Sequence, residues 1–132
     1  MDVVIDTSAI IAVITNEPER DTLISRTFDA SLLAPASSHW EVGNAFSAML
    51  KRRRITLPET RLALRNYERI AMRFVDIDLG QAVELADNFN IYAYDAYVAA
   101  CAINFRCPLL TLDKGLIEVA EKIGIEVMET KP

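Results

Sequence analysis

The sequence predicts a single α/β domain with a central parallel sheet of four to five strands and helices on both faces, a three-layer α/β/α arrangement. Short apolar runs suited to buried strands alternate with longer helix-like segments along the whole chain. That alternation implies right-handed crossovers and a parallel sheet. The 132 residues, 52% of them apolar and 25% charged, have the size and composition of one globular domain. No repeat, linker or low-complexity segment interrupts them, so one domain is expected over residues 1–132.

Five short apolar runs are the candidate strands. In chain order they lie at residues 3–5, 31–34, 74–77, 108–112 and 125–128. The first is entirely β-branched, a composition typical of strands. Pro35 ends the second run, because proline cannot donate a hydrogen bond within a sheet, and Gly124 introduces the fifth.

The intervening segments are predicted helices. They lie at residues 9–14, 19–28, 37–53, 58–72, 80–88, 95–105 and 114–123. Ser37 and Ser38 are suitable N-caps for the long third helix, in which Trp40 and Phe46 are expected to pack into the core or a protein interface. Pro58 fits the first turn of the fourth helix, where the missing amide of proline would have no partner in any case.

Charge is unevenly distributed along the chain. The net charge of −5 has the wrong sign for a protein that binds nucleic acid through its overall field. Residues 51–73 nevertheless hold eight basic side chains against two acidic ones. Within that segment basic residues recur every four positions, at Arg61, Arg65, Arg69 and Arg73. Like charges at this spacing repel on a helix, so either an anionic partner or solvent faces them.

The amino-terminal region carries neither a basic leader nor an apolar stretch near the ~20 residues that a membrane span needs. A cytoplasmic location without membrane association is therefore expected. Cys101 and Cys107 have no metal-ligand spacing, and we expect two buried free thiols.

Four acidic residues are expected at the carboxyl edge of the sheet, where parallel α/β folds bind ligands. Asp6 and Asp113 end strands, Glu41 lies one turn into a helix, and Asp95 opens another. Each also suits a structural role: Asp95 and Asp113 as helix N-caps, Asp6 in a turn, and Glu41 in a capping box with Ser38. Four carboxylates on one edge repel one another unless a cation neutralises them. Because no His or Cys accompanies them, Mg²⁺ or Mn²⁺ is favoured over zinc.

The segments around these acids resemble the motifs of the PIN-domain family. They are residues 4–9 (VIDTSA), 39–45 (HWEVGNA), 94–102 (YDAYVAACA) and 110–116 (LTLDKGL). The four occur in the family's order and span nearly the whole chain. The compact length and the segment 51–57 (KRRRITL) most resemble the VapC-type toxins of toxin–antitoxin pairs.

This resemblance implies a metal-dependent endoribonuclease that hydrolyses RNA phosphodiester bonds. Asp6, Glu41, Asp95 and Asp113 would bind Mg²⁺ or Mn²⁺ and carry catalysis. Thr7, Ser8 and Thr111 would support them, and Asn44 is a further polar neighbour of Glu41 or a surface residue. Some family members place another acid just after the fourth, where this chain has Gly115 and Leu116. One tightly held ion is therefore expected rather than two.

The resemblance also implies partners. An antitoxin would hold the toxin inactive, and two toxin chains would form a homodimer. The helices over residues 38–72 would form an apolar groove for an antitoxin helix, and the four spaced arginines would contact RNA phosphates or acidic antitoxin residues.

Aromatic residues and the single histidine lie close to the acids in the sequence. Tyr92, Tyr94 and Tyr97 bracket Asp95 and are candidates to line an RNA groove, although Tyr97 is better placed to be buried. His39 is expected at the surface rather than in catalysis.

Two other functions suit parts of the pattern. Phosphatases of the haloacid-dehalogenase type also begin with a strand that ends in Asp, but they place a second acid two residues later, where this chain has Ser8. A non-catalytic PIN or receiver-like domain that binds a protein partner would have no need of the four acids.

Overall fold

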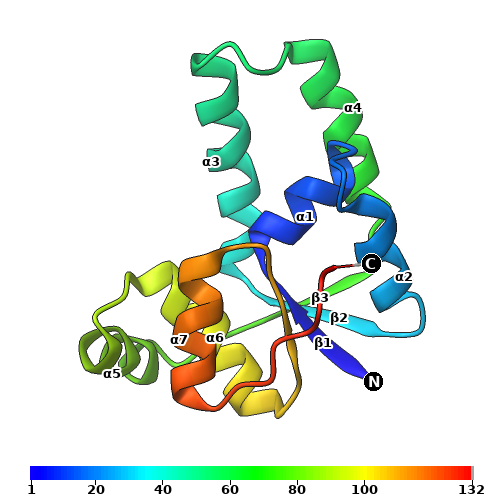
Figure 1. Ribbon diagram of the computed structural model, residues 1–132. Coiled ribbons are helices and arrows are strands. Elements are labelled where there is room, and N and C mark those ends of the chain that lie inside the picture. The colour runs from blue at the N-terminus through cyan, green and yellow to red at the C-terminus, as the bar shows by residue number, and fades with distance from the viewer. Residues whose placement is uncertain (132) are drawn as a thin grey trace.

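A four-stranded parallel sheet in the order β3-β2-β1-β4 forms the centre of the computed structural model, which describes residues 1–131 (Figure 1). Its strands are β1 (Asp2–Ile5), β2 (Ser31–Pro35), β3 (Met72–Val75) and β4 (Leu109–Leu110). Val4 of the inner strand β1 pairs with Leu33 of β2 on one side and Leu109 of β4 on the other. The fully parallel order confirms the predicted crossovers.

Helices cover both faces of this sheet. They are α1 (Thr7–Ile14), α2 (Arg20–Thr27), α3 (Ser37–Lys51), α4 (Leu57–Glu68), α5 (Leu79–Phe89), α6 (Ala93–Phe105) and α7 (Lys114–Ile123). Val3 and Ile5 point into an apolar core with α1 and α3, whereas Val4 points into a second core with α6 and α7. Because side chains alternate along a strand, these two cores lie on opposite faces, and the predicted three-layer α/β/α architecture is confirmed.

Helices α3 and α4 form a hairpin that extends away from the sheet (Figure 1). Thr56 begins α4 with a capping box: its hydroxyl accepts from the Glu59 amide at 3.2 Å, and Glu59 accepts from the Thr56 amide at 3.0 Å. The tip before this cap contains Arg53, whose positive φ of 56° reverses the chain after α3. The exposed basic residues 51–54 are therefore held at the end of the hairpin.

The boundary between α4 and β3 differs from the prediction. The helix ends at Glu68 and the strand begins at Met72, whereas a helix to residue 72 and a strand over 74–77 were expected. Met72 pairs with Leu32 of β2, and this sheet pairing overrides the helical pattern of the local sequence. Arg73 consequently lies on β3, so the four spaced arginines do not form one helical stripe.

The predicted fifth strand over residues 125–128 is reduced to a single bridge beside β4, where the Leu109 amide donates to Glu126 O and the Met128 amide donates to Leu109 O, both at 2.9 Å. Val127 forms only an isolated parallel bridge with Leu109, and the sheet has four strands among the residues described. The strand expected over residues 108–112 is reduced to Leu109–Leu110. Within residues 1–131, no helix is long and apolar enough to cross a bilayer.

Replacement of Thr56 by alanine is expected to lower the free energy of unfolding by about 1 kcal/mol, because the first turn of α4 loses its side-chain cap. Urea denaturation followed by circular dichroism measures this change. Thr22→Ala in α2, where no cap is lost, is the control and should change stability by less than ~0.5 kcal/mol. Equal effects of the two substitutions would show that the capping box does not stabilise the hairpin.

Candidate active site

Asp6 is the most buried acid at the carboxyl edge of the sheet, with 7% of its surface exposed. It follows β1 directly and is the N-cap of α1. Its Oδ2 atom accepts three hydrogen bonds, from the Ser8 amide at 3.4 Å, the Ser8 hydroxyl at 2.8 Å and the Thr111 hydroxyl at 2.8 Å. All three bonds converge on one oxygen, which orients the other oxygen, Oδ1, away from this network.

Ser8 and Thr111 connect the first acid to the fourth. Their hydroxyls lie 3.2 Å apart, and Ser8 Oγ accepts from the Leu112 amide at 3.0 Å. Thr111 Oγ1 accepts from the Asp113 amide at 3.0 Å. Asp113 itself is an exposed N-cap of α7, as the capping interpretation predicted, because its Oδ1 accepts from two amides of that helix at 2.9 and 3.2 Å. The network therefore fixes the positions of Asp6 and Asp113 relative to each other.

Glu41 on α3 is held by a contact that is distant in sequence. The Thr7 hydroxyl donates to Glu41 Oε2 at 2.8 Å, and Glu41 Oε1 is buried with no hydrogen-bond partner. Ser38 and Glu41 do not form the capping box that was the structural alternative for Glu41. Ala36 is the N-cap of α3, and no side chain caps that helix. A buried carboxylate oxygen without a donor is unfavourable unless a ligand reaches it.

Asp95 is the third residue of α6 and is half-buried. The N-cap of this helix is Tyr92, so the interpretation of Asp95 as a cap is wrong. The Asp95 carboxylate is therefore not needed as the N-cap of α6 and is available for another role.

The four acids influence one another electrostatically. Burial raises the pKa of Glu41, the charges of Asp6 and Asp95 raise it further, and the Thr7 hydrogen bond opposes them. Burial likewise raises the pKa of Asp95, with added contributions from Asp113 and Asp6. Together with the hydrogen bonds of Thr7 and Thr111, these effects indicate that the four predicted acids lie near one another, although they are far apart in sequence.

The cluster is more open than a complete metal site. Over the described residues 1–131, no three His, Cys, Asp or Glu side chains are arranged so that they could hold a metal ion. The acids thus lie near one another without converging on one point.

The other predicted residues differ in their exposure to solvent. Asn44 is exposed on α3, and His39 is exposed with its Nδ1 atom 2.9 Å from the Tyr67 hydroxyl. Trp40 is 72% exposed and so lies outside the core, whereas Phe46 is buried.

Of the three tyrosines, Tyr92 and Tyr94 are exposed, and Tyr97 is half-buried with its ring edge-on to Tyr94. The arginines at positions 61, 65, 69 and 73 are all exposed.

Sequence reasoning missed a pocket of about 290 Å³ at the carboxyl ends of β2 and β3, on the edge of the sheet that carries the acids. Ser37, which was interpreted only as a cap, lines this pocket, and its hydroxyl is buried without a partner. Tyr97, two positions after Asp95, also lines it. Its place next to an acidic motif was the one sequence signal for this pocket.

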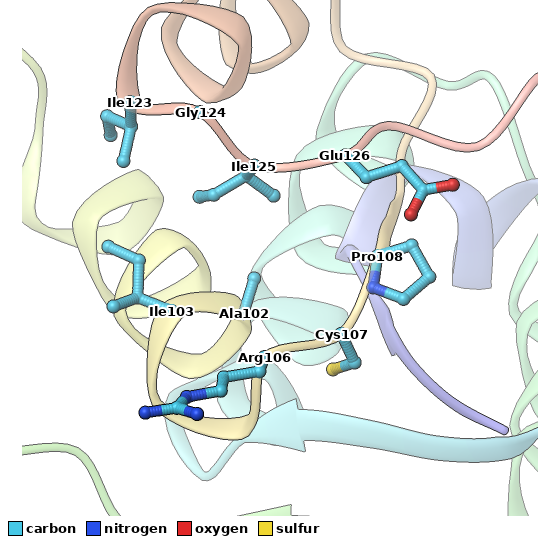
Figure 2. Close-up of a pocket in the computed structure, with 9 residues that line it drawn as sticks. All are labelled: Ala102, Ile103, Arg106, Cys107, Pro108, Ile123, Gly124, Ile125 and Glu126. Atoms are coloured by element: carbon cyan, nitrogen blue, oxygen red, sulfur yellow. The ribbon is translucent and has the colours of Figure 1, made fainter.

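A second cavity, of about 430 Å³, lies at the other edge of the sheet (Figure 2). It is bounded by the segment that enters β4 and by the carboxyl ends of α6 and α7, and Cys107 and Arg106 lie at its border (Figure 2). Cys107 and Cys101 are free thiols, as predicted, and burial raises the pKa of Cys101 to about 12. A thiol with so high a pKa is unreactive at neutral pH.

A model of the PIN domain family matches residues 3–122 of this sequence. The chain belongs to the PIN domain family. PIN domains are generally nucleases, so membership supports hydrolytic chemistry and disfavours the haloacid-dehalogenase alternative. No curated protein matches the chain.

Several solved structures share this fold at low sequence identity. PAE2754 of Pyrobaculum aerophilum superimposes with a TM-score of 0.71 and 20% identity over 90% of this chain and 79% of its own. VapBC2 of Rickettsia felis, bound to a fragment of its promoter DNA, has a TM-score of 0.66 and 14% sequence identity, over 98% of both chains. The VapC20 toxin of Mycobacterium tuberculosis, which cleaves the sarcin–ricin loop, has a TM-score of 0.66 and 12% sequence identity, over 96% of this chain and 98% of its own.

Replacement of Glu41 by glutamine is expected to raise the melting temperature at pH 7.5 in buffer containing EDTA. The raised pKa means that burial and the neighbouring acids disfavour the Glu41 carboxylate in the folded protein. For such an acid, the native state loses stability as the pH rises through the folded pKa and is unaffected below the unfolded value. The advantage of the glutamine variant should therefore vanish near pH 4.

Thermal melts between pH 4 and 8 measure this difference. Glu84→Gln, at an exposed position of α5, is the matched control. The expectation would be contradicted if the Glu41→Gln variant melted below the wild type at pH 7.5. It would also be contradicted if its melting temperature differed from that of the wild type by the same amount at every pH.

Proposed function

We propose that this PIN domain is a Mg²⁺- or Mn²⁺-dependent endoribonuclease and the toxin component of a toxin–antitoxin pair. The observation that carries the proposal is the cluster of four acids at the carboxyl edge of the sheet, with Glu41 Oε1 buried and unpartnered. A cation at this place would offset the burial and the mutual repulsion that raise the pKa values of Glu41 and Asp95.

The oxygen atoms that the cluster offers as metal ligands suit a hard divalent ion. All are carboxylate oxygens, the ligands that Mg²⁺ and Mn²⁺ prefer. Mg²⁺ keeps several of its waters and is commonly held by one or two carboxylates together with substrate phosphate, so three converging protein ligands are not required. When bound, the ion would supply positive charge to polarise the scissile phosphate and to lower the pKa of a water molecule.

The residues of the cluster are suited to different tasks. Asp6 is fixed by three hydrogen bonds and is the best-oriented candidate for a direct ligand. Glu41, oriented by Thr7, would bind the ion through Oε1 or hold the attacking water. Asp95 and Asp113 lie nearer the surface, where they would complete the site once substrate and ion are present. The reaction would be in-line hydrolysis of an RNA phosphodiester.

The partners follow from the hairpin and from the structural relatives. Arg61 and Arg65 on α4 and the basic tip at residues 51–54 would contact RNA phosphates or acidic antitoxin residues. Leu57 and Leu62 expose apolar surface on α4, which suits an antitoxin helix or a second copy of the chain. Solved relatives include a toxin–antitoxin complex from Klebsiella pneumoniae. We propose a homodimer in the cytoplasm that a cognate antitoxin inhibits.

Cleavage of RNA by purified, antitoxin-free protein with Mg²⁺ or Mn²⁺ tests the proposed activity. Cutting is expected to stop with EDTA and to fall at least about a hundredfold in Asp6→Asn and Asp95→Asn, since charge stabilisation by the ion contributes several kcal/mol. Asp87→Asn, exposed on α5, is the control and should cut like the wild type. Absence of cutting with either ion would favour a non-catalytic PIN domain that binds a protein partner.

Metal binding is testable without any substrate. At a Mg²⁺ concentration about a hundred times the dissociation constant, a single native-state site stabilises a protein by about 2.7 kcal/mol. The melting temperature of the wild type should therefore rise by several degrees over a NaCl control of equal ionic strength. The rise should be lost in Asp6→Asn and retained in Asp87→Asn. An equal rise in all three proteins would place the ion elsewhere.

A further inference from the structure

The pocket of about 290 Å³ at the carboxyl ends of β2 and β3 has a mixed lining. Val75, Ile77 and Leu79 supply its apolar surface, and Tyr97 supplies an aromatic wall. Its polar groups are Ser37 at the start of α3 and Asp76 directly after β3. Its volume lies at the lower end of the range for small-molecule pockets, so it suits one flat ring system better than a larger ligand.

Ser37 gives this pocket an unsatisfied polar group. Its hydroxyl is buried and has no hydrogen-bond partner. Most buried hydroxyls in proteins are paired, and an unpaired one costs about 1–3 kcal/mol. A ligand with a donor or acceptor on its edge would satisfy this group.

The pocket adjoins the acid cluster through shared helices. Ser37 lies one turn before Glu41 on the same face of α3, because residues four apart on a helix are neighbours. Tyr97 and Asp95 both belong to the amino-terminal part of α6, although residues two apart point to different sides of a helix. The strand that leads to Asp6 is next to β2, and adjacent strands are about 5 Å apart. A chain whose phosphate meets the acids would therefore reach the pocket with a neighbouring nucleotide.

We propose that this pocket binds one nucleobase of the RNA substrate next to the scissile phosphate, and that Asp76 selects bases that carry an exocyclic amino group. The proposal rests on the proposed ribonuclease function. Single-stranded RNA is commonly read by bases that leave the stack and contact aromatic side chains, which is the contact that Tyr97 offers.

Asp76 determines which base fits. A carboxylate accepts hydrogen bonds and donates none, so it pairs with the amino groups of adenine, cytosine or guanine. Uracil has no amino group: its one donor on this edge, N3–H, lies between two carbonyl oxygens that would face a negative charge. One lost hydrogen bond of about 1 kcal/mol corresponds to about fivefold discrimination. Uracil should therefore be disfavoured about fivefold at one position beside the cut.

Sequencing of the fragment ends from an RNA pool with a randomised segment tests this preference. Asp76→Asn should reduce the discrimination against uracil to less than about twofold, because the amide both donates and accepts. Leu79→Ala should raise KM with little change in kcat, since it removes apolar contact with the base. Asp87→Asn and Val83→Ala, exposed on α5 outside the pocket, are matched controls and should keep the wild-type profile.

A binding measurement separates this proposal from the proposed nuclease. AMP, CMP, GMP and UMP are each added to ¹⁵N-labelled protein in EDTA, and the amide resonances of Ser37, Ile77 and Tyr97 are followed. Saturable shifts confined to the pocket and weakest for UMP would support the base site, even if the protein cuts no RNA. RNA cleavage with no shift at these amides and the same base profile in Asp76→Asn would overturn the base site and leave the nuclease intact.

Discussion

The buried carboxylate of Asp6 is the constraint on which both the sheet and the site depend. A buried charge is tolerated only when hydrogen bonds or a cation compensate it. Here the hydroxyls of Ser8 and Thr111 and one amide converge on a single oxygen. The strand before Thr111 has only two residues, so this network also fixes the end of the shortest strand next to β1. The same bonds thus stabilise the fold and orient the acid.

Helix termini explain why the other acids are tolerated to different degrees. The amino end of a helix carries a partial positive charge that stabilises a nearby carboxylate. Asp113 caps α7 and Asp95 lies in the first turn of α6, so both benefit. Glu41 is beyond the first turn of α3, and one of its oxygens has no donor. The weakest compensation in the cluster is therefore at Glu41, where a bound cation would have the largest effect.

The sequence predicted the architecture well because the strand–helix alternation is strong throughout. The acids that directly follow strands or lie early in helices already indicated a common edge. Its errors arose where tertiary contacts override local patterns. Pairing with β2 converts Met72 to strand despite helical periodicity. Glu41 has capping-box spacing, yet it bonds Thr7, 34 positions away. Pockets such as the one at Ser37 depend on how several elements meet, which no local pattern encodes.

An acidic protein can bind a polyanion only where its basic residues are kept apart from its acidic ones. The four acids would repel RNA phosphates, and the net charge of −5 adds to that repulsion. The basic residues 51–54 lie at the tip of the α3–α4 hairpin, away from the sheet (Figure 1). Contacts there would strengthen substrate and transition-state binding equally and so would not accelerate the chemical step. In the proposed enzyme, rate would depend on the acids and the ion, and the hairpin would supply affinity at a distance from them.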